Sequence, residues 1–290
     1  DGDDWLYVDN PDTVADGGAG TDRLFVVNGT GVSNAVGSTS IEIAWGNAGD
    51  DTFDGTGAAV GLSLRGLGGD DILTGGDYDD YINGDAGADE LRGGAGTDRL
   101  YVDAQDTVID AGTGNDDRLF VTGTAGVTIG MAVAHAEIAY GNAGNDTFNG
   151  LTSTVALTLH GKSGNDTLIG GDMNDRLYGE GNAGGGDTLN GSLGNDYLFG
   201  GTNAGGWAER DQFVFDANWG DDRIFDFADN GFEKIDFSSI AGITGLGDLT
   251  ITDGVGYARI AYSDTAGWDA SIRVDGVHAA DLGTNDFIFV

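Results

Sequence analysis

The residues of this chain that could do chemistry are aspartates that recur at a fixed interval. Between residues 66 and 101 the sequence consists of four consecutive nonapeptides, GLGGDDILT, GGDYDDYIN, GDAGADELR and GGAGTDRLY. Each begins with Gly, has Asp at its sixth place and has Ile or Leu at its eighth place. Carboxylate and carbonyl oxygens are the ligands that Ca²⁺ prefers, usually roughly six to eight of them. The pattern therefore indicates repeated calcium sites.

Short strands joined by glycine-rich turns must position these aspartates. Strands this short cannot pair as hairpins, but a coiling chain can stack them, so we expect an all-β, right-handed parallel β-roll (a β-solenoid). Two nonapeptides would complete one turn, with the eighth-place residues in a narrow core. Asp residues 18 positions apart, such as Asp71 with Asp89 or Asp80 with Asp98, would then stack on one edge. Glycine is expected where φ is positive and where carbonyls turn toward the ion.

These nonapeptides resemble the GGxGxDxUx repeat of the RTX proteins, a calcium-binding parallel β-helix signature. In that family each ion lies between two coils. Its ligands are the sixth-place Asp of both coils, the carbonyls of places two and four of the first coil, and the carbonyls of places one and three of the second. The resemblance implies one site from Leu67, Gly69 and Asp71 with Gly84, Ala86 and Asp89, a second from Gly76, Tyr78 and Asp80 with Gly93, Ala95 and Asp98, and a third from Gly171, Met173 and Asp175 with Gly191, Leu193 and Asp196.

Further candidate ligands follow from the same pattern. Asp4 and Asp22 are 18 positions apart and could share one ion. Tyr78 and Met173 replace the usual fourth-place Gly, which predicts some backbone strain there. The remaining candidate ligands are Asp51, Asp117, Asp146, Gly164, Asp166 and Asp187.

The repeats lie inside a longer duplication. LYVDAQDTVID at 100–110 repeats LYVDNPDTVAD at 6–16, and AEIAYGNAGNDTF at 136–148 repeats IEIAWGNAGDDTF at 41–53. The offset indicates an internal duplication of about 95 residues. We therefore expect a β-roll at residues 1–200, made of two copies at about 1–95 and 96–200, with an insertion at 179–181 and the last repeat near Gly201.

The segment after the repeats is rich in Phe and Ile. Its stretches DQFVF, DDRIFDF, EKIDFSSI and NDFIFV resemble the serralysin-type C-terminal domain of secreted proteases and related enzymes. In that family the region caps the roll and holds an uncleaved signal for type I secretion. Solenoids need an atypical terminal unit to close the core, so we expect a mixed-β cap at 201–290, with Trp207 and Trp219 covering the end of the roll.

Composition narrows the possible partners. The formal net charge is −37, and the acidic residues are almost all Asp. Two Lys and ten Arg, scattered along the chain, argue against nucleic acid. No apolar run approaches the roughly 18 residues of a membrane span. Because cytosolic calcium is scarce, we expect a secreted, extracellular or cell-surface location. The sequence begins in mid-repeat, from which we expect a piece of a longer protein.

Catalysis has little support in the sequence. It contains neither HExxH nor GxSxG, and the three histidines, His135, His160 and His278, are far apart. Among 49 acidic residues, some pair will fall at a workable distance by chance, so the chain is predicted not to be an enzyme.

The function we expect is a calcium-binding module of an extracellular Gram-negative bacterial protein. Such a module would pass unfolded through a type I secretion exporter and fold on Ca²⁺ outside, from the C-terminal cap inward. One alternative is an adhesin or polysaccharide-binding roll whose coils at 26–45 and 121–140 present the ligand face. Others are a surface-layer or filament subunit, and the non-catalytic part of a secreted protease, epimerase or lyase.

Overall fold

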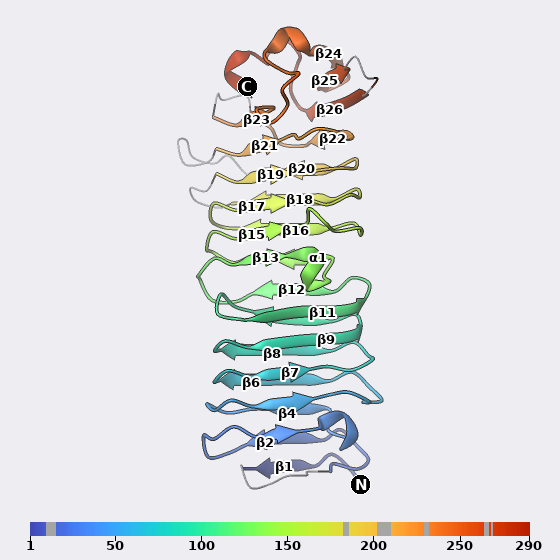
Figure 1. Ribbon diagram of the computed structural model, residues 1–290, viewed down its shortest axis with the longest axis vertical. Helices are drawn as coiled ribbons and strands as arrows, with labels where there is room; N and C mark the ends of the chain where they lie inside the picture. The colour runs from blue at the N-terminus through green and yellow to red at the C-terminus, as the bar shows by residue number, and fades with distance from the viewer. Residues whose placement is uncertain (10–15, 182–185, 202–209, 229–231, 264–266, 268) are drawn as a thin grey trace. The chain divides into compact units, whose positions relative to one another are not determined.

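The computed structural model describes residues 1–9, 16–181, 186–201, 210–228, 232–263, 267 and 269–290. These form two compact units: Asp1–Gly123 with Val133–Ala139, and Thr124–Ala132 with Tyr140–Val290. Short parallel strands dominate both units (Figure 1). The helix α1 (Met131–Ala134) and the strand β14 (Ile138–Tyr140) contain residues of both. The predicted all-β parallel solenoid is confirmed.

The first unit has two parallel sheets, and the chain passes back and forth between them. One sheet contains, in order, β1 (Trp5–Val8), β2 (Arg23–Val26), β4 (Ile43–Trp45), β6 (Ser63–Gly68), β8 (Tyr81–Ala86), β10 (Arg99–Val102) and β12 (Arg118–Val121). The other contains β3 (Ser33–Asn34), β5 (Thr52–Asp54), β7 (Ile72–Thr74), β9 (Glu90–Gly96) and β11 (Val108–Gly114). The short 3₁₀ helix η1 (Val36–Ser38) lies between β3 and β4 in the chain.

The second unit repeats this arrangement. One parallel sheet contains β13 (Thr128–Gly130), β15 (Thr147–Asn149), β17 (Thr167–Ile169), β19 (Thr188–Asn190), β21 (Gln212–Val214), β23 (Lys234–Asp236) and β27 (Phe287–Ile288). The other contains β16 (Thr158–Lys162), β18 (Arg176–Glu180), β20 (Tyr197–Phe199) and β22 (Asp221–Ile224), followed by β26 (Asp269–Asp275), β25 (Tyr257–Ser263) and β24 (Thr250–Gly254). The parallel stacking thus extends beyond Gly201, where the recognisable repeats were expected to stop.

The eighth-place residues form the core, as the nine-residue period predicts. Leu64 pairs with Ile82, Ile82 with Leu100, and Leu100 with Leu119, and all four side chains are fully buried. The strand neighbours of each point to the opposite face, because side chains alternate along a strand. Pairing of equivalent residues fixes the register, so the sixth-place residue just before each strand also lies over its equivalent in the next coil.

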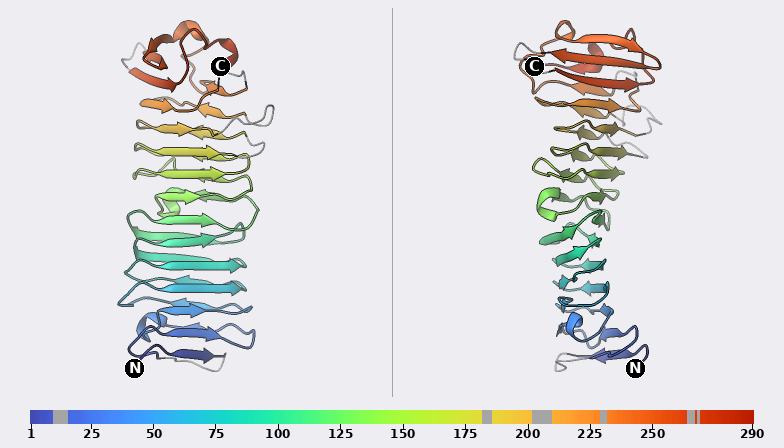
Figure 2. Two further views of the ribbon diagram at one scale, coloured as in Figure 1. Left: turned by 180° about the vertical axis from the view of Figure 1, so that it is seen from behind. Right: turned by 90° about the vertical axis from the view of Figure 1, so that its right-hand side faces the viewer.

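The C-terminal end of the second unit is a mixed-β cap. The parallel sheet continues from β22 to β26, after which β25 and β24 pair antiparallel (Figure 2). Trp219 is buried there, and its ring lies 5.7 Å from the ring of Phe215 and 5.4 Å from that of Phe237, between centroids. Trp219 thus covers the core as expected, whereas Trp207 lies outside the described residues. The domain boundary near residue 200 stays a prediction.

Candidate metal centre

The sixth-place aspartates form ladders along the edges of both units. The backbone N–H of Asp71 donates to Oδ1 of Asp89 over 2.8 Å, and that of Asp80 donates to Oδ1 of Asp98 over 2.8 Å. Each carboxylate therefore links its own coil to the preceding one. The same hydrogen bond, 2.7–2.8 Å long, joins Asp4 to Asp22, Asp51 to Asp71, Asp98 to Asp117, Asp146 to Asp166, Asp166 to Asp187, and Asp175 to Asp196.

The second carboxylate oxygen lies over the first-place glycine of the same nonapeptide. A β-carbon added at Gly66 would lie 1.9 Å from Oδ2 of Asp71 and 2.8 Å from the carbonyl oxygen of Gly84. A carboxylate oxygen of one coil and a carbonyl oxygen of the next thus converge on the space that the missing side chain leaves. The same is true of Gly75 with Asp80 and Gly93, and of Gly170 with Asp175 and Gly191.

Lack of space explains glycine at the first place. Gly66 and Gly75 do not have positive φ, so it is space for oxygen atoms, and not backbone freedom, that excludes a side chain. Positive φ occurs instead at fourth-place glycines such as Gly69 (φ 106°) and Gly87 (φ 149°), as expected, and at the second place, where several residues are not glycine. These are Leu67 (φ 78°), Asp85 (φ 67°), Lys162 (φ 77°), Glu180 (φ 71°) and Ser192 (φ 69°).

Fourth-place residues bring further oxygens together. A β-carbon added at Gly87 would lie 1.7 Å from the carbonyl oxygen of Gly69 and 3.3 Å from Oδ1 of Asp89. Four of the six residues expected at this site thus supply oxygens that converge in pairs. They are Gly69 and Asp71 of one coil, and Gly84 and Asp89 of the next. The other two, Leu67 and Ala86, lie on the paired strands β6 and β8 beside them.

The sites containing Tyr78 and Met173 differ from expectation in one respect. Neither residue has positive φ, so the predicted backbone strain is absent. Their carbonyl groups still face the next coil. A β-carbon added at Gly96 would lie 2.8 Å from the carbonyl oxygen of Tyr78, and one added at Gly194 would lie 2.4 Å from that of Met173. Replacement of the fourth-place glycine therefore changes the local turn but keeps the carbonyl in place.

In the second unit, Gly164, a predicted ligand, lies beside Asp166, and Gly179, expected to belong to an insertion, lies beside Asp187. A β-carbon at Gly164 would lie 3.1 Å from Oδ1 of Asp166. One at Gly179 would lie 2.4 Å from Oδ2 of Asp187, so Gly179 is the first-place glycine of that coil. The insertion expected at 179–181 therefore begins after Glu180, and residues 182–185 lie outside the described part of the chain.

Seven ladder carboxylates have one buried oxygen that no protein group satisfies within the described part of the chain. These are the Oδ2 atoms of Asp22, Asp71, Asp89, Asp98, Asp117, Asp166 and Asp196. Burial, and then the charges of neighbouring carboxylates, raise the pKa of Asp71 and of Asp98 to about 7. Burial, and then the charge of Asp222, raise the pKa of Asp196 to about 9. A buried anion without a counterion is costly, and a cation would remove that cost.

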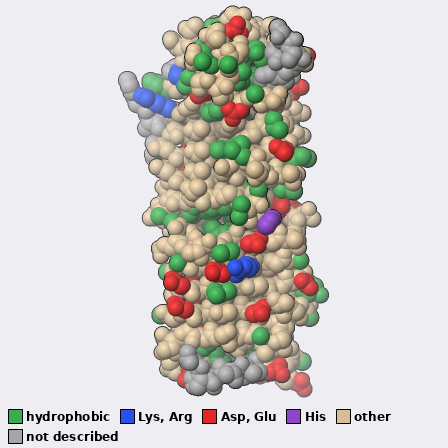
Figure 3. Space-filling view, viewed as in Figure 1, with side chains coloured by type: hydrophobic (Ala, Val, Ile, Leu, Met, Phe, Trp, Pro, Cys, Tyr) green, Lys and Arg blue, Asp and Glu red, His purple; other side chains and the backbone are tan. Residues whose placement is uncertain are grey.

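The donor set fits calcium. It consists of oxygens alone, from carboxylates and backbone carbonyls, which suits a hard cation. No group of three or more His, Cys, Asp or Glu side chains that could hold a metal occurs among the described residues, so carbonyls must complete any site. On the face drawn in Figure 3, acidic side chains are scattered and basic ones are few.

Among the described residues, five members of the ladders were missed in the sequence. One is Asp106, whose Oδ1 accepts a hydrogen bond from the backbone N–H of Asp89 over 3.3 Å. Glu42 and Glu137 accept hydrogen bonds from the backbone N–H of Asp22 (2.7 Å) and Asp117 (2.9 Å) through Oε2. Their coils lack the motif, but each lies directly before the strand-like stretch IAW or IAY. Asp211 and Asp222 accept from the backbone N–H of Asp187 (2.9 Å) and Asp196 (2.8 Å). The sequence feature that could have identified Asp211 and Asp222 is the apolar residue two places later, Phe213 or Ile224.

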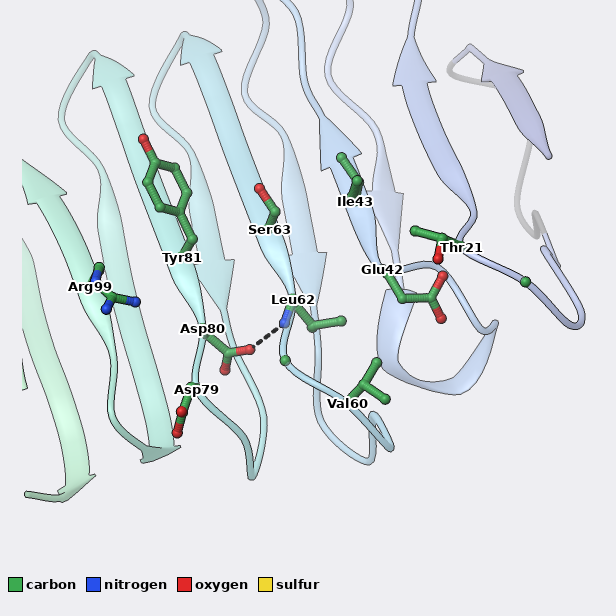
Figure 4. A pocket seen from close by; sticks show the side chains of 12 residues that line it. Thr21, Glu42, Ile43, Val60, Leu62, Ser63, Asp79, Asp80, Tyr81 and Arg99 are labelled. Atoms are coloured by element: carbon green, nitrogen blue, oxygen red, sulfur yellow. Dashed lines mark hydrogen bonds between the residues drawn. The ribbon is translucent and has the colours of Figure 1, made fainter. Parts of the chain in front are cut away.

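One ladder is interrupted at Leu62. Its backbone N–H donates to Oδ1 of Asp80 over 2.6 Å, but Leu62 itself offers no carboxylate (Figure 4). An open hollow of about 480 Å³ lies there, and Glu42, Val60 and Arg99 are among the residues that line it. The sixth-place ladder therefore contains one apolar position between Glu42 and Asp80.

Comparison with known proteins agrees with this geometry. The model of the RTX calcium-binding nonapeptide repeat (4 copies) matches residues 36–59, 65–100, 134–152, 158–183 and 182–204. The chain contains RTX calcium-binding repeats. That prediction is confirmed, and the repeats indicate Ca²⁺ as the bound ion; the resemblance of the last segment to a serralysin-type domain stays a prediction. No curated protein matches the chain.

Ten chains of solved structures match this chain, among them the following three. The AlgE6R2 subunit of the Azotobacter vinelandii mannuronan C5-epimerase is 23% identical, with a TM-score of 0.33 over 58% of this chain and 94% of that one. The AlgE6R3 subunit of the same enzyme is 22% identical, with a TM-score of 0.31 over 58% of this chain and 80% of that one. The extracellular lipase LipA of Serratia marcescens is 18% identical, with a TM-score of 0.30 over 98% of this chain and 42% of that one.

No helix in the described part of the chain has the length and apolar character needed to cross a membrane.

Proposed function

We propose that this chain is a calcium-dependent folding module of an extracellular protein. The observation that supports it most is the set of buried sixth-place carboxylates whose Oδ2 atoms have no hydrogen-bond partner in the described part of the protein. Without a cation the folded chain must protonate these groups or hold like charges close together in a dry environment. The unfolded chain avoids both costs. Calcium would therefore shift the equilibrium toward the folded state, as metals do when the site forms only on folding.

The residues would act as follows at the site between the coils that begin at Gly66 and Gly84. Asp71 and Asp89 supply carboxylate oxygens, and Gly69 and Gly84 supply carbonyl oxygens. Calcium, when bound, supplies the positive charge that these oxygens lack. The glycines keep side chains out of the site, and the buried eighth-place residues Leu73 and Leu91 hold the two coils in register.

Calcium titration by equilibrium dialysis tests this proposal. We expect several ions per chain at pH 8 and fewer in the D71N/D89N variant. The matched control is D70N, which removes one charge from the exposed neighbour of Asp71. Asp70 accepts a hydrogen bond from the N–H of Ala88 through Oδ1, which Asn can also accept. Equal calcium uptake by all three proteins would refute the proposal.

The same chemistry suits export of an unfolded chain. In the low-calcium cytosol the formal charge of −37 would keep the chain expanded and able to pass through a type I exporter. Outside, calcium would fold it, beginning with the C-terminal cap. Residues 207–290 would carry the export signal. A reporter fused ahead of residues 101–290 should be secreted by cells with such an exporter, and one fused to residues 1–206 should remain inside; secretion of both would refute the placement of the signal.

A second candidate function is binding of an extracellular polysaccharide. Trp5, Tyr7 and Trp45 project from β1 and β4 with exposed rings, and Phe25 of β2 lies between them, 5.3–5.5 Å from each ring. Flat aromatic faces can stack on sugar rings. This face overlaps the expected ligand face at 26–45 only at Trp45. In a glycan array in calcium buffer, a signal lost in W5A/Y7A would support this function, and absence of any signal would exclude it for the glycans tested.

A further inference from the structure

Residues 217–225, which follow the last recognised repeat, have the backbone contacts of a calcium-binding nonapeptide at equivalent places. The family model ends at residue 204, and the sequence ANWGDDRIF at 217–225 has Ala at its first place and Trp at its third. In the structure, β20 pairs with β22 in parallel, with Tyr197 opposite Arg223 and Leu198 opposite Ile224. Residues 217–225 therefore lie one coil after 191–199, with Asp222 at the sixth place.

Three contacts between these two coils repeat those between the recognised coils 170–178 and 191–199. At the fourth place, a β-carbon on Gly220 would lie 1.7 Å from the carbonyl oxygen of Gly194, as one on Gly194 would lie 2.4 Å from that of Met173. The short approach brings the carbonyl of the earlier coil against the later turn in both cases.

The fifth and sixth places agree as well. The N–H of Asp221 donates to Oδ1 of Asn195 over 2.8 Å, as the N–H of Asn195 donates to Oδ1 of Asn174 over 2.9 Å. The N–H of Asp196 donates to Oδ1 of Asp222 over 2.8 Å, as the N–H of Asp175 donates to Oδ1 of Asp196 over 2.7 Å. The turn at 217–222 is therefore built like a repeat although its sequence does not match the motif.

The first of these two coils contains an unsatisfied carboxylate oxygen. Asp196 is fully buried, and its Oδ2 has no hydrogen-bond partner among the residues that the structure describes. That atom would be 2.2 Å from a β-carbon at Gly191, so it occupies the space that first-place glycine leaves in the recognised sites. Asp222 is 3% exposed and adds a second buried carboxylate. Two buried acids, and a carbonyl that approaches the turn of the later coil, supply oxygens of the kind that Ca²⁺ prefers.

From this geometry we infer a calcium site between residues 191–199 and 217–225, with the carboxylates of Asp196 and Asp222 and the carbonyl of Gly194 among its ligands. The inference rests on the proposed calcium-binding function and extends it beyond the recognised repeats. Ala217 occupies the first place, where glycine would leave room for a further oxygen, and Ile272 lies opposite Asp222 in β26. The site is therefore the last one on this edge.

This position gives the ion a specific role. Trp219, three residues before Asp222, packs against Phe215, Phe237 and Tyr262 in the core of the cap. An ion held by Asp222 would thus join the repeat ladder to the cap through one short turn. Occupation of this site would connect folding of the cap to folding of the adjacent repeats.

The test is calcium stoichiometry of the full chain, measured by dialysis and elemental analysis. D222N keeps the shape of the side chain and the Oδ1 acceptor, and we expect it to bind one ion fewer than the unaltered chain. The matched control D221N changes an exposed neighbour whose Oδ1 accepts a hydrogen bond from Ser271, and it should keep the full number. D89N, within the recognised repeats, should also lose calcium.

The outcomes separate this inference from the proposed function. Loss of calcium in D89N with full stoichiometry in D222N would overturn the new site alone, whereas full stoichiometry in both would refute calcium binding by the ladder. If D222N fails to fold in excess calcium, Tb³⁺ serves as the probe. Trp219 should then transfer excitation energy to a bound Tb³⁺, and W219F should show weaker tryptophan-sensitised emission. Unchanged emission would overturn the site.

Discussion

Replacement of Asp71 by Asn should change stability in opposite directions with and without calcium. Asp71 is fully buried, and burial is the main reason that its pKa rises from 3.8 to about 7. At pH 8 the carboxylate is ionised in both folded and unfolded chains. At ~1.4 kcal/mol per pKa unit, the difference corresponds to about 4 kcal/mol of destabilisation of the calcium-free fold.

Asn removes that charge and keeps the oxygen that accepts the hydrogen bond from the N–H of Asp51, over 2.7 Å. In chelator at pH 8, D71N should therefore be more stable than the unaltered chain, by at most about 4 kcal/mol. In calcium it should be less stable, because a neutral amide replaces a charged ligand on Oδ2. D70N, exposed and next in sequence, should shift stability by less than about 0.5 kcal/mol in both conditions.

Urea unfolding followed by tryptophan fluorescence and circular dichroism measures both effects. If the calcium-free chain is unfolded in buffer, the chelator series is run in TMAO, which favours compact states. If D71N is less stable than the unaltered chain in chelator as well as in calcium, the reasoning is refuted. That result would show that the charge of Asp71 does not destabilise the calcium-free fold.

Four further outcomes follow from the same geometry. G66A places a β-carbon 1.9 Å from Oδ2 of Asp71, so it should raise the calcium concentration at the folding midpoint, whereas G247A, with nothing within 4 Å, should leave it unchanged; equal midpoints would contradict the steric argument. Calcium affinity should fall between pH 8 and pH 6 with proton release on binding, because the raised pKa values of Asp71, Asp98, Asp166 and Asp187, all about 7, let protons compete. In chelator, the free energy of unfolding should depend on pH in the opposite direction. Protonation of these groups stabilises the calcium-free fold fully below about pH 4, and this stability is lost as pH rises through 7. A calcium-free fold that becomes more stable from pH 5 to pH 8 would contradict this expectation. L73A, in the buried core, should cost roughly 2–5 kcal/mol in calcium, and I72A, its half-exposed neighbour, much less; similar urea midpoints for the two would argue against the eighth-place core.

The sequence predicts the coils well because two local requirements share one period. An apolar eighth-place residue such as Leu73 must enter the core, and the sixth-place Asp71 two positions earlier must then lie at the edge. Together these determine strand pairing, register and the stacking of Asp71 under Asp89. Both constraints are visible in any nine-residue unit that keeps its glycines.

The rest of the ladder was not predictable because coil length varies while register does not. The sixth-place residues lie 20 positions apart from Asp22 to Glu42, 24 from Asp187 to Asp211 and 26 from Asp196 to Asp222. Extra residues enter at the turns, where they leave the buried strands in register. A search for a fixed interval therefore loses the ladder where the turns lengthen or where Glu replaces Asp.

The reason for glycine at the first place is also visible only in the structure. A motif with Gly at that place is equally compatible with positive φ and with lack of space, and only the position of Oδ2 of Asp71 over Gly66 distinguishes them. Substitution tolerance differs between the two causes. D-amino acids or Asn suit positive φ, whereas no side chain fits a space that ligand oxygens occupy.

The most direct test of a calcium-dependent folding module is circular dichroism of the full chain at pH 8, in excess chelator and then in calcium, with tryptophan emission recorded in parallel. The account predicts an unfolded spectrum in chelator, β-structure after calcium is added, and burial of Trp219 at the same calcium concentration. Magnesium at equal concentration should not substitute, because it demands shorter, near-octahedral ligation. A chain that shows the same β-spectrum and the same tryptophan emission in chelator and in calcium would contradict the central claim.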